Sequence, residues 1–228
     1  MKVDRGREPV ITIDGPAGAG KSTVARLLAA RLGYRLLDTG GMYRALAWSV
    51  AHAKIDPADE AAIGRHLATV NVTVDGDRVL VNGRDVTAEI RSPEIGALTS
   101  IITALASVRD AVTPLQRSVA ARGAVVLEGR DTGTVVCPDA DVKFFVDASL
   151  ETRARRRQAE LAALGRTLSI EAVRDEIVVR DAQDRTRALA PLRKADDAIE
   201  VDTSERTTDE VVAVMVETVE RVRCCTRS

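Results

Sequence analysis

Residues 15–22 form the part of this sequence whose types and spacing most directly indicate a chemical task. They read Gly-Pro-Ala-Gly-Ala-Gly-Lys-Ser and match the pattern G-x-x-x-x-G-K-[ST]. In such a loop, backbone N–H groups bind phosphate oxygens, the lysine reaches the β and γ oxygens, and the serine hydroxyl coordinates Mg²⁺. We therefore predict a site for ATP or GTP with Mg²⁺, in which Ser22 is the metal ligand and the nucleotide-binding residues are Gly15, Pro16, Ala17, Gly18, Ala19, Gly20, Lys21, Ser22 and Thr23.

A phosphate-binding loop is compatible with a small-molecule kinase, a GTPase switch or a mechanochemical ATPase. Residues 38–41, Asp-Thr-Gly-Gly, fit the D-x-x-G pattern of switches, but the sequence has no N-K-x-D motif for guanine. The nearest string, residues 193–196, has Arg in place of Asn. A motor ATPase needs an acid pair at a strand end, for which Leu127-Glu128 is only a partial candidate. These patterns favour a kinase.

A kinase has to hold a second phosphate beside the γ-phosphate of ATP, and this requires arginines from several segments. One arginine, Arg44, lies one turn inside the helix predicted after the Gly-rich segment 37–41. Two further candidates, Arg130 and Asp131, follow the strand-like run that ends at Leu127. Ligands of α/β sheets bind at the carboxyl ends of strands, so these residues are candidates for the acceptor site.

Arg180, Asp184 and Arg187 are spaced i, i+4 and i+7, and they therefore share one face of a predicted helix. Such a face can be an exposed, ion-paired surface that contributes little to stability. It can equally supply charged groups to the acceptor site. The spacing alone leaves both interpretations open.

The elements that must position these residues alternate between strand-like and helix-like segments. Several of the strand-like runs are apolar throughout, as in central strands of a parallel sheet that is covered on both faces. This alternation predicts an α/β fold with βα units. The five runs are Val10 to Ile13, Arg35 to Leu37, Val125 to Leu127, Val142 to Val146 and Ile199 to Val201.

One stretch, residues 70–86, breaks this pattern because its apolar residues alternate with polar ones. It contains the dipeptides Asp75-Gly76 and Asn82-Gly83, both of which are strong hairpin signals. We therefore predict a small antiparallel β insert. It is either a decorative surface hairpin or part of a ligand-binding region.

The composition argues against nucleic acid and membranes as partners. Of 228 residues, 33 are basic and 34 acidic, which gives a net charge of −1 and no global field toward nucleic acid or a lipid surface. The charged N-terminus lacks the apolar core of a secretory signal, and we expect a cytoplasmic protein, with no membrane or nucleic-acid partner. The sequence shows no conspicuous apolar surface, which favours a monomer. The three cysteines, to which we assign no role, are Cys137, Cys224 and Cys225.

Four segments, in this order and over nearly the whole chain, resemble the bacterial cytidylate kinases. They are the loop 15–22, residues 37–44 (Leu-Asp-Thr-Gly-Gly-Met-Tyr-Arg), residues 129–134 (Gly-Arg-Asp-Thr-Gly-Thr) and residues 180–192 (Arg-Asp-Ala-Gln-Asp-Arg-Thr-Arg-Ala-Leu-Ala-Pro-Leu). The resemblance also accounts for the β insert, because that family has an enlarged monophosphate-binding region with such an extension. Two positions depart from it: Glu128 stands where relatives often have Asp, and Thr39 replaces the commoner Ser.

The resemblance implies a role for each matching position. Arg44, Arg130 and Arg187 clamp the acceptor phosphate, with Thr39 and Tyr43 beside it. Ser100, Arg109 and Asp131 read the cytosine edge, whereas Arg180 and Asp184 hold the sugar. The position of Arg109 rests on the string Val-Arg-Asp-Ala at residues 108–111, and Ser100 rests on its spacing from Arg109. Lys21, Arg130 and Arg187 are the expected catalytic residues.

These base contacts are consistent with the hydrogen-bond donors and acceptors of cytosine. Cytosine presents an N4 amino donor beside its N3 and O2 acceptors, so a carboxylate of Asp131 can accept from N4 while Arg109 donates to the acceptors. Uracil has O4 in place of the amino group, and two buried acceptors would then face each other at a cost of about 1–3 kcal/mol.

An arginine-dense segment follows the fourth strand-like run, and positions 153, 156 and 157 share a helix face. In nucleoside monophosphate kinases a short lid brings arginine over the ATP phosphates and excludes water. We expect a lid at about 151–168 that contacts ATP through arginine. Arg157 is the first candidate for this contact and Arg153 is the second. The alternative is a solvated basic face.

The sequence therefore predicts transfer of the γ-phosphoryl group of ATP to CMP or dCMP with Mg²⁺. The alternatives are a kinase for UMP, dTMP or shikimate, or a P-loop regulatory protein. We expect one domain with a P-loop NTPase-type five-stranded parallel sheet, helices on both faces, a small antiparallel insert and a short helical lid. Its parts are a core (8–38, 111–150 and 169–228), a monophosphate-binding region (39–110) with the insert at about 70–92, and the lid.

Overall fold

The computed structural model describes residues 7–75, 78–163 and 165–227. The chain divides into two compact units. The first comprises Met1–Leu36 and Arg122–Ser228, and the second comprises Leu37–Ala121. The sequence-based boundary at residue 110 falls inside helix α5 (Ala106–Ala120), which belongs to the second unit.

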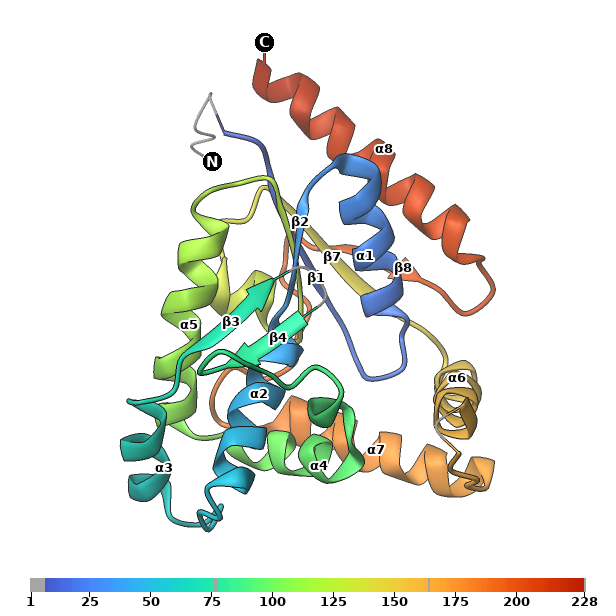
Figure 1. Cartoon of the computed structure of the whole chain (residues 1–228). Helices are drawn as coiled ribbons and strands as arrows, with labels where there is room; N and C mark the ends of the chain where they lie inside the picture. The colour runs from blue at the N-terminus through green and yellow to red at the C-terminus, as the bar shows by residue number, and fades with distance from the viewer. Residues whose placement is uncertain (1–6, 76–77, 164, 228) are drawn as a thin grey trace. The chain divides into compact units, whose positions relative to one another are not determined.

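The first unit is built on a parallel sheet with the strand order β2-β6-β1-β7-β8 (Figure 1). Every strand-like run of the sequence forms one of these strands, so the predicted α/β class is confirmed. The strands are β1 (Val10–Asp14), β2 (Arg35–Asp38), which continues into the second unit, β6 (Val125–Glu128), β7 (Val142–Asp147) and β8 (Ile199–Asp202).

Strand β1 is central, with β6 on one side and β7 on the other, and all five of its residues are buried. Helices α1 (Lys21–Leu32) and α8 (Thr208–Arg227) pack on each other and share a core with the sheet (Figure 1). That core includes Ile11 and Ile13 of β1, Leu28 of α1, Phe144 of β7 and Met215 of α8. Because all five residues of β1 are buried and the strand is paired on both sides, its carboxyl end is held in place at the start of the phosphate loop.

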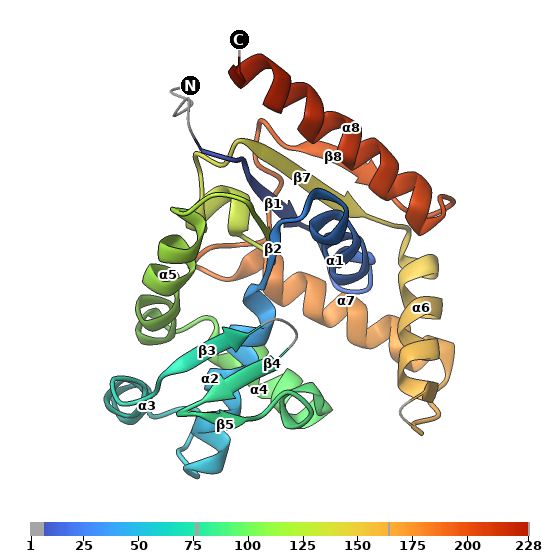
Figure 2. The ribbon, with the colours of Figure 1, turned by 45° about the horizontal axis from the view of Figure 1, so that its top comes forward.

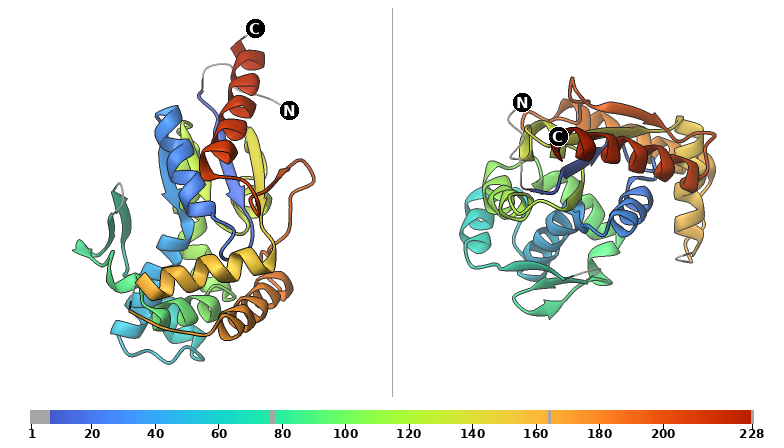
Figure 3. Two further views of the ribbon diagram at one scale, coloured as in Figure 1. Left: turned by 90° about the vertical axis from the view of Figure 1, so that its right-hand side faces the viewer. Right: turned by 90° about the horizontal axis from the view of Figure 1, so that it is seen from above.

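Helices α6 (Leu150–Ala163) and α7 (Ile170–Thr186) lie side by side in the first unit (Figure 3). They bury a small apolar cluster of their own that includes Ala154, Leu161, Val173 and Ile177. The segment predicted as a lid is thus α6 with the turn after it, packed against α7. Leu164 lies outside the described residues, and the closing motion of a lid stays a prediction.

The second unit contains the three-stranded antiparallel sheet β3-β4-β5, which confirms the predicted insert (Figure 2). Asn82 and Gly83 have φ angles of 50° and 80°, the left-handed pair that a two-residue hairpin turn requires. Gly76 and Asp77, in the other predicted turn, lie outside the described residues. The strands are β3 (Val72–Asp75), β4 (Arg78–Val81) and β5 (Arg84–Asp85).

The helices of the second unit include an apolar pair, α4 (Pro93–Ile102) and α5, bent by 99° at a short break. This bent pair meets the length and composition of a membrane span, whereas no single helix in the described part of the chain does. Both helices bury apolar side chains in the protein, among them Ile102 and Val108. The other elements are α2 (Thr39–His52), α3 (Glu60–Leu67) and the 3-10 turn η1 (Glu89–Arg91).

Candidate functional site

The phosphate loop leaves the sheet at the carboxyl end of β1, between strands β6 and β7, where α/β folds bind ligands. Gly15 begins the loop with a φ of 149°. A Cβ atom at this position would lie 1.9 Å from the carbonyl oxygen of Val146 in β7. Only glycine therefore allows the loop to pass over the end of β7.

Lys21 is buried at the start of α1, and its Nζ donates to the carbonyl oxygen of Pro16 at 2.5 Å. Burial, together with the nearby positive charges of Arg130 and Arg180, lowers the pKa of Lys21 to about 7. Glu128 opposes the shift. A charged lysine is thus less favourable at this position than in water, and an adjacent anion such as phosphate would favour it.

Ser22 and Glu128 form an oxygen-rich pair beside the loop. The Ser22 hydroxyl donates to Oε2 of Glu128 at 3.0 Å, and Glu128 itself is buried at the end of β6. Among the described residues no group of three or more His, Cys, Asp or Glu side chains forms a metal cage. Mg²⁺ usually binds through one or two protein oxygens together with substrate phosphates and water, so this pair fits Mg²⁺.

Asp14 connects the phosphate loop to the segment that carries Arg130 and Asp131. Its carboxylate accepts the backbone N–H of Thr132 at 2.9 Å, the Thr132 hydroxyl at 2.8 Å and the backbone N–H of Gly133 at 2.7 Å. Burial raises the pKa of Asp14, and these hydrogen bonds oppose the rise. The bonds hold the start of the π-helical turn η2 (Thr132–Val136), which places the two preceding side chains.

The structure brings four of the predicted acceptor residues together in one network of alternating charge. Nε of Arg130 donates to Oδ2 of Asp184 at 2.9 Å, and Nη2 of Arg187 donates to Oδ1 of Asp131 at 3.4 Å. Nη1 of Arg187 also lies 3.7 Å from Oδ1 of Asp184. The Asp131 and Arg187 side chains are only 5% and 8% exposed. The shared face of α7 is therefore not a solvated surface.

Arg187 is fixed by the turn that ends α7. Its Nε donates to the carbonyl oxygen of Ala190 at 2.5 Å, and the N–H of Leu192 donates to the carbonyl oxygen of Asp184 at 2.7 Å. Ala190 has a φ of 50°, a left-handed conformation that costs a non-glycine residue about 1 kcal/mol. This local strain is offset by the bonds that orient Arg187.

In the second unit, Arg44 is oriented by Asp38 at the start of α2. Oδ1 of Asp38 accepts the backbone N–H of Gly41 at 2.7 Å and caps the helix, while Oδ2 accepts Nη2 of Arg44, also at 2.7 Å. Thr39 and Tyr43 are buried on the same helix. One carboxylate thus fixes both the helix start and the arginine.

The structure also brings Arg109 and Tyr43 together. The Arg109 guanidinium lies 5.6 Å from the centre of the Tyr43 ring, and its Nη1 is 3.5 Å from the tyrosine hydroxyl. Nε of Arg109 donates to the carbonyl oxygen of Thr103 at 2.9 Å. Ser100 is connected to this group through Thr103, whose hydroxyl donates to the Ser100 carbonyl at 3.3 Å. The Ser100 hydroxyl donates to the carbonyl of Gly96, within its own helix.

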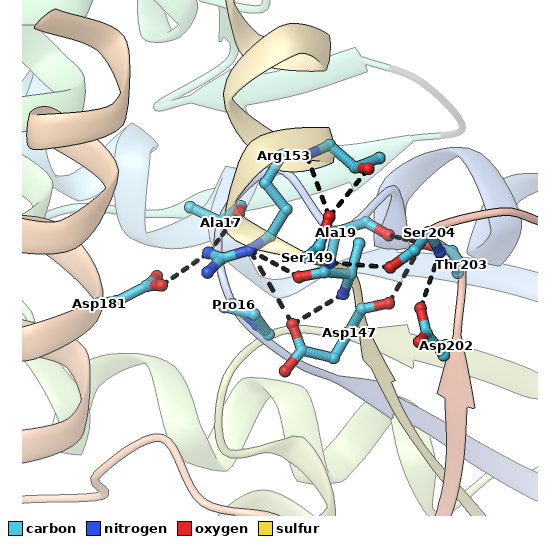
Figure 4. A network of polar contacts seen from close by, with 12 residues as sticks. Pro16, Ala17, Ala19, Asp147, Ser149, Arg153, Asp181, Asp202, Thr203 and Ser204 are labelled. Atoms are coloured by element: carbon cyan, nitrogen blue, oxygen red, sulfur yellow. Dashed lines mark hydrogen bonds and ion pairs between the residues drawn. The ribbon is translucent and has the colours of Figure 1, made fainter. Parts of the chain in front are cut away.

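The two arginines expected over ATP differ in environment. Arg157 is 36% exposed and donates to Glu160 at 3.1 Å on the surface of α6. Arg153 is buried and contacts the phosphate loop itself, through the carbonyl oxygen of Ala17 (Figure 4). Direct contact of either arginine with ATP stays a prediction.

Four residues that contact the site have no role in the sequence-based assignment. Asp14 and Asp38 orient site residues, and each directly follows a predicted strand and precedes a Gly-rich segment, which is the signal that marks them. Glu128 directly follows the third predicted strand, and this position is the signal for its place beside Ser22. Thr203 follows the last strand directly and contacts the loop at Ala19, so its place at the strand end is a usable signal.

Comparison with known proteins identifies close relatives over almost the whole chain. The sequence model of the family described as "Cytidylate kinase" matches residues 11–221. The cytidylate kinase of Geobacter sp. (strain M21) is 48% identical over 223 residues, which cover 96% of both chains. That of Mycobacterium avium (strain 104) is 49% identical over 208 residues, covering 89% of this chain and 91% of the relative.

A solved structure supports the fold independently of these sequences. The crystal structure of an uncharacterized protein from Eubacterium ventriosum ATCC 27560 aligns with a TM-score of 0.53, covering 93% of this chain and 99% of that one. The two sequences are only 12% identical. The likeness therefore concerns the fold alone.

Proposed function

The chain belongs to the cytidylate kinase family, and on this basis we propose that it transfers the γ-phosphoryl group of ATP to CMP or dCMP, giving CDP or dCDP and ADP. The observation that supports this most directly is the position of Lys21. It is buried in the phosphate loop and close enough to Arg130 and Arg180 that their charges lower its pKa. The lysine proposed for the donor phosphate thus lies near arginines proposed for the acceptor site.

The reaction is an in-line displacement. An oxygen of the CMP phosphate attacks the γ-phosphorus, and the bond from that phosphorus to the β–γ bridging oxygen breaks as ADP leaves. The attacking group is already an anion, so no strong general base is needed. Catalysis consists of positioning both phosphates and neutralising their charge, for which Lys21 and the loop N–H groups serve the donor.

Ser22 and Glu128 would hold Mg²⁺, the serine directly and the glutamate through bound water. When bound, Mg²⁺ neutralises charge on the β- and γ-phosphates and helps to fix their orientation. The Ser22–Glu128 hydrogen bond of 3.0 Å supports this assignment, because it already places both oxygen donors side by side.

Arg44, Arg130 and Arg187 clamp the acceptor phosphate in this proposal, with Thr39 and Tyr43 beside it. Arg130 and Arg187 now pair with carboxylates of Asp184 and Asp131, and a doubly charged phosphate has to compete with these pairs. The paired geometry keeps the guanidinium groups oriented, which reduces the entropy lost when the substrate binds.

Asp131, Arg109 and Ser100 read the cytosine base, and Arg180 and Asp184 hold the sugar. A carboxylate of Asp131 accepts from the N4 amino group of cytosine, and uracil cannot supply that donor. The buried position of Asp131 supports a selective contact, since water cannot easily replace a missing donor there.

We further propose that the protein acts as a cytoplasmic monomer in pyrimidine nucleotide metabolism, as one domain with a core, a monophosphate-binding region and a lid. The near-neutral net charge of −1 supports small-molecule substrates rather than nucleic acid or a membrane surface as its partners.

The proposal is tested by measuring ADP production from Mg·ATP with CMP, dCMP, UMP, dTMP, AMP, GMP and shikimate. We expect high rates for CMP and dCMP and low rates for every other acceptor. A high rate with UMP, dTMP or shikimate instead would identify a different kinase. Slow hydrolysis that is indifferent to all acceptors would indicate a regulatory nucleotide-binding protein.

A further inference from the structure

The carbonyl groups of the phosphate loop are held by side chains outside its nucleotide-facing surface. The carbonyl oxygen of Ala17 accepts Nη1 of Arg153 at 3.2 Å, and that of Ala19 accepts the Thr203 hydroxyl at 3.0 Å (Figure 4). In a trans peptide the C=O of one residue points opposite to the N–H of the next. Fixing these two carbonyls therefore directs the N–H groups of Gly18 and Gly20 to the opposite side, where phosphate is bound.

Arg153 makes its contacts from the first turn of α6, and its side chain is 8% exposed. Nη1 also donates to Oδ2 of Asp181 at 2.6 Å, and Nε donates to the carbonyl oxygen of Ala148 at 3.1 Å (Figure 4). The loop packs directly on this turn, because a Cβ at Gly18 would lie 3.1 Å from Cβ of Arg153. The guanidinium thus joins the loop, the end of β7 and helix α7.

A second arginine of α6 supports the loop from the end of β8. Nη1 and Nη2 of Arg156 donate to the hydroxyl and the carbonyl oxygen of Thr203 at 2.9 and 2.7 Å. Because the hydroxyl accepts from Arg156, its own proton is available for the carbonyl oxygen of Ala19 at 3.0 Å, with the carbonyl oxygen of Asp147 as a second acceptor at 3.2 Å. Helix α6 therefore controls both loop carbonyls, one directly and one through Thr203.

Asp181 connects this support to the acceptor residues. It lies on α7 beside Arg180 and within one turn of Asp184, and its side chain is 11% exposed. In the described part of the chain, its second oxygen, Oδ1, has no hydrogen-bond partner. The bond to Arg153 is therefore the main contact that keeps this buried carboxylate satisfied, and breaking it is costly.

We propose that Arg153 is a positioning residue, which fixes the Ala17 carbonyl and, through Asp181, links the phosphate loop to the helix that carries the acceptor residues. This inference rests on the proposed function and concerns the same site. A lid arginine that swings over ATP would have to leave Asp181 first. In the positioning role, the bond to Asp181 is required for activity.

The two roles predict opposite effects of Asp181→Asn. Positioning predicts that Asp181→Asn and Arg153→Lys each raise the KM for ATP and the Kd for ADP by about tenfold, since each loses a charged hydrogen bond behind the loop. The double variant should have a KM and a Kd no higher than those of the more impaired single variant, because both changes break the same bond. If Arg153 is instead a lid arginine that has to leave Asp181, the Asp181→Asn variant should retain or exceed normal activity.

The experiment measures kcat and KM for ATP at saturating CMP, and the Kd for ADP by calorimetry, with thermal unfolding as a check on folding. Arg155→Ala is the matched control, since Arg155 is 67% exposed on the same helix and pairs only with Glu151 among the described residues. It should leave both constants unchanged. Normal ADP binding by folded Asp181→Asn, or effects that multiply in the double variant, would overturn the inference. Wild-type protein that binds ADP but phosphorylates no acceptor would refute the proposed function alone, because ADP binding still tests Arg153.

Discussion

Nε of Arg130 donates to Oδ2 of Asp184 at 2.9 Å across a sequence separation of 54 residues. The pair joins the turn after β6 to helix α7, and Arg187 extends it to Asp131. Each arginine of the first unit that we assign to the acceptor phosphate thus has a carboxylate partner. Substrate phosphate replaces or joins an anion that already orients the guanidinium, which explains how several like charges remain together in the folded protein.

Replacing Lys21 with Ala should lower kcat at least about 100-fold, because the phosphates lose their only buried loop cation among the described residues. The assay is ADP formation at saturating ATP and CMP. Lys194→Ala is the control, since Lys194 is exposed and pairs with Glu200 at the surface. Near-normal turnover by the Lys21 variant would remove the central role of the loop.

Binding of ADP should be coupled to uptake of a proton. Free Lys21 has a pKa of about 7, and an adjacent phosphate raises it, so the affinity is fully developed below pH 7 and falls as the pH rises above 7. At pH 8.5, calorimetry in two buffers with different ionisation enthalpies should report uptake of about one proton. The Lys21→Arg variant cannot titrate there and is the control. Absence of uptake by the wild type would mean that Lys21 is already charged in the free protein.

Asp131→Asn should reduce the ratio of kcat/KM for CMP to that for UMP by about tenfold, because an amide can donate to O4 of uracil. The ratio is the informative quantity, since loss of the Asp131–Arg187 pair also affects the phosphate clamp for both acceptors. The KM for ATP serves as the internal control. Unchanged discrimination would show that another residue reads the base.

Glu128→Gln should raise the Mg²⁺ concentration needed for half-maximal activity by about tenfold, because an amide holds metal-bound water less strongly than a carboxylate. The same shift should appear in the Mg²⁺ dependence of ADP binding, which does not depend on turnover. Glu217→Gln, on the exposed surface of α8, is the control. An unaltered Mg²⁺ dependence would exclude Glu128 from the metal site.

The strands, the phosphate loop and the β insert could be predicted because their signals are local. Apolar runs, glycine spacing and an Asn-Gly dipeptide each act within a few residues, and the insert turn at Asn82-Gly83 has the predicted geometry. The candidate arginines were also identified, since acceptor chemistry requires that residue type.

The partners of these side chains could not be predicted, because they come from distant parts of the chain. Asp14 contacts Thr132 across 118 residues, and Arg153 contacts Asp181 across 28. Helical periodicity shows that Arg153 and Arg157 share a face of α6, but not which part of that face another element covers. The packing of α7 and the loop buries Arg153 and leaves Arg157 partly exposed.

Helix α7 also constrains how this enzyme can be redesigned. Arg180 and Asp184, which we propose to hold the sugar, are the targets for changing the preference between ribose and deoxyribose, and Asp181 lies between them on the same helical turns. A mutant library that varies the whole stretch would mix two phenotypes, altered sugar choice and loss of ATP use. Keeping Asp181 constant while varying 180 and 184 preserves its bond to Arg153, so that a screen with dCMP reports on the acceptor site, in which Asp184 also pairs with Arg130.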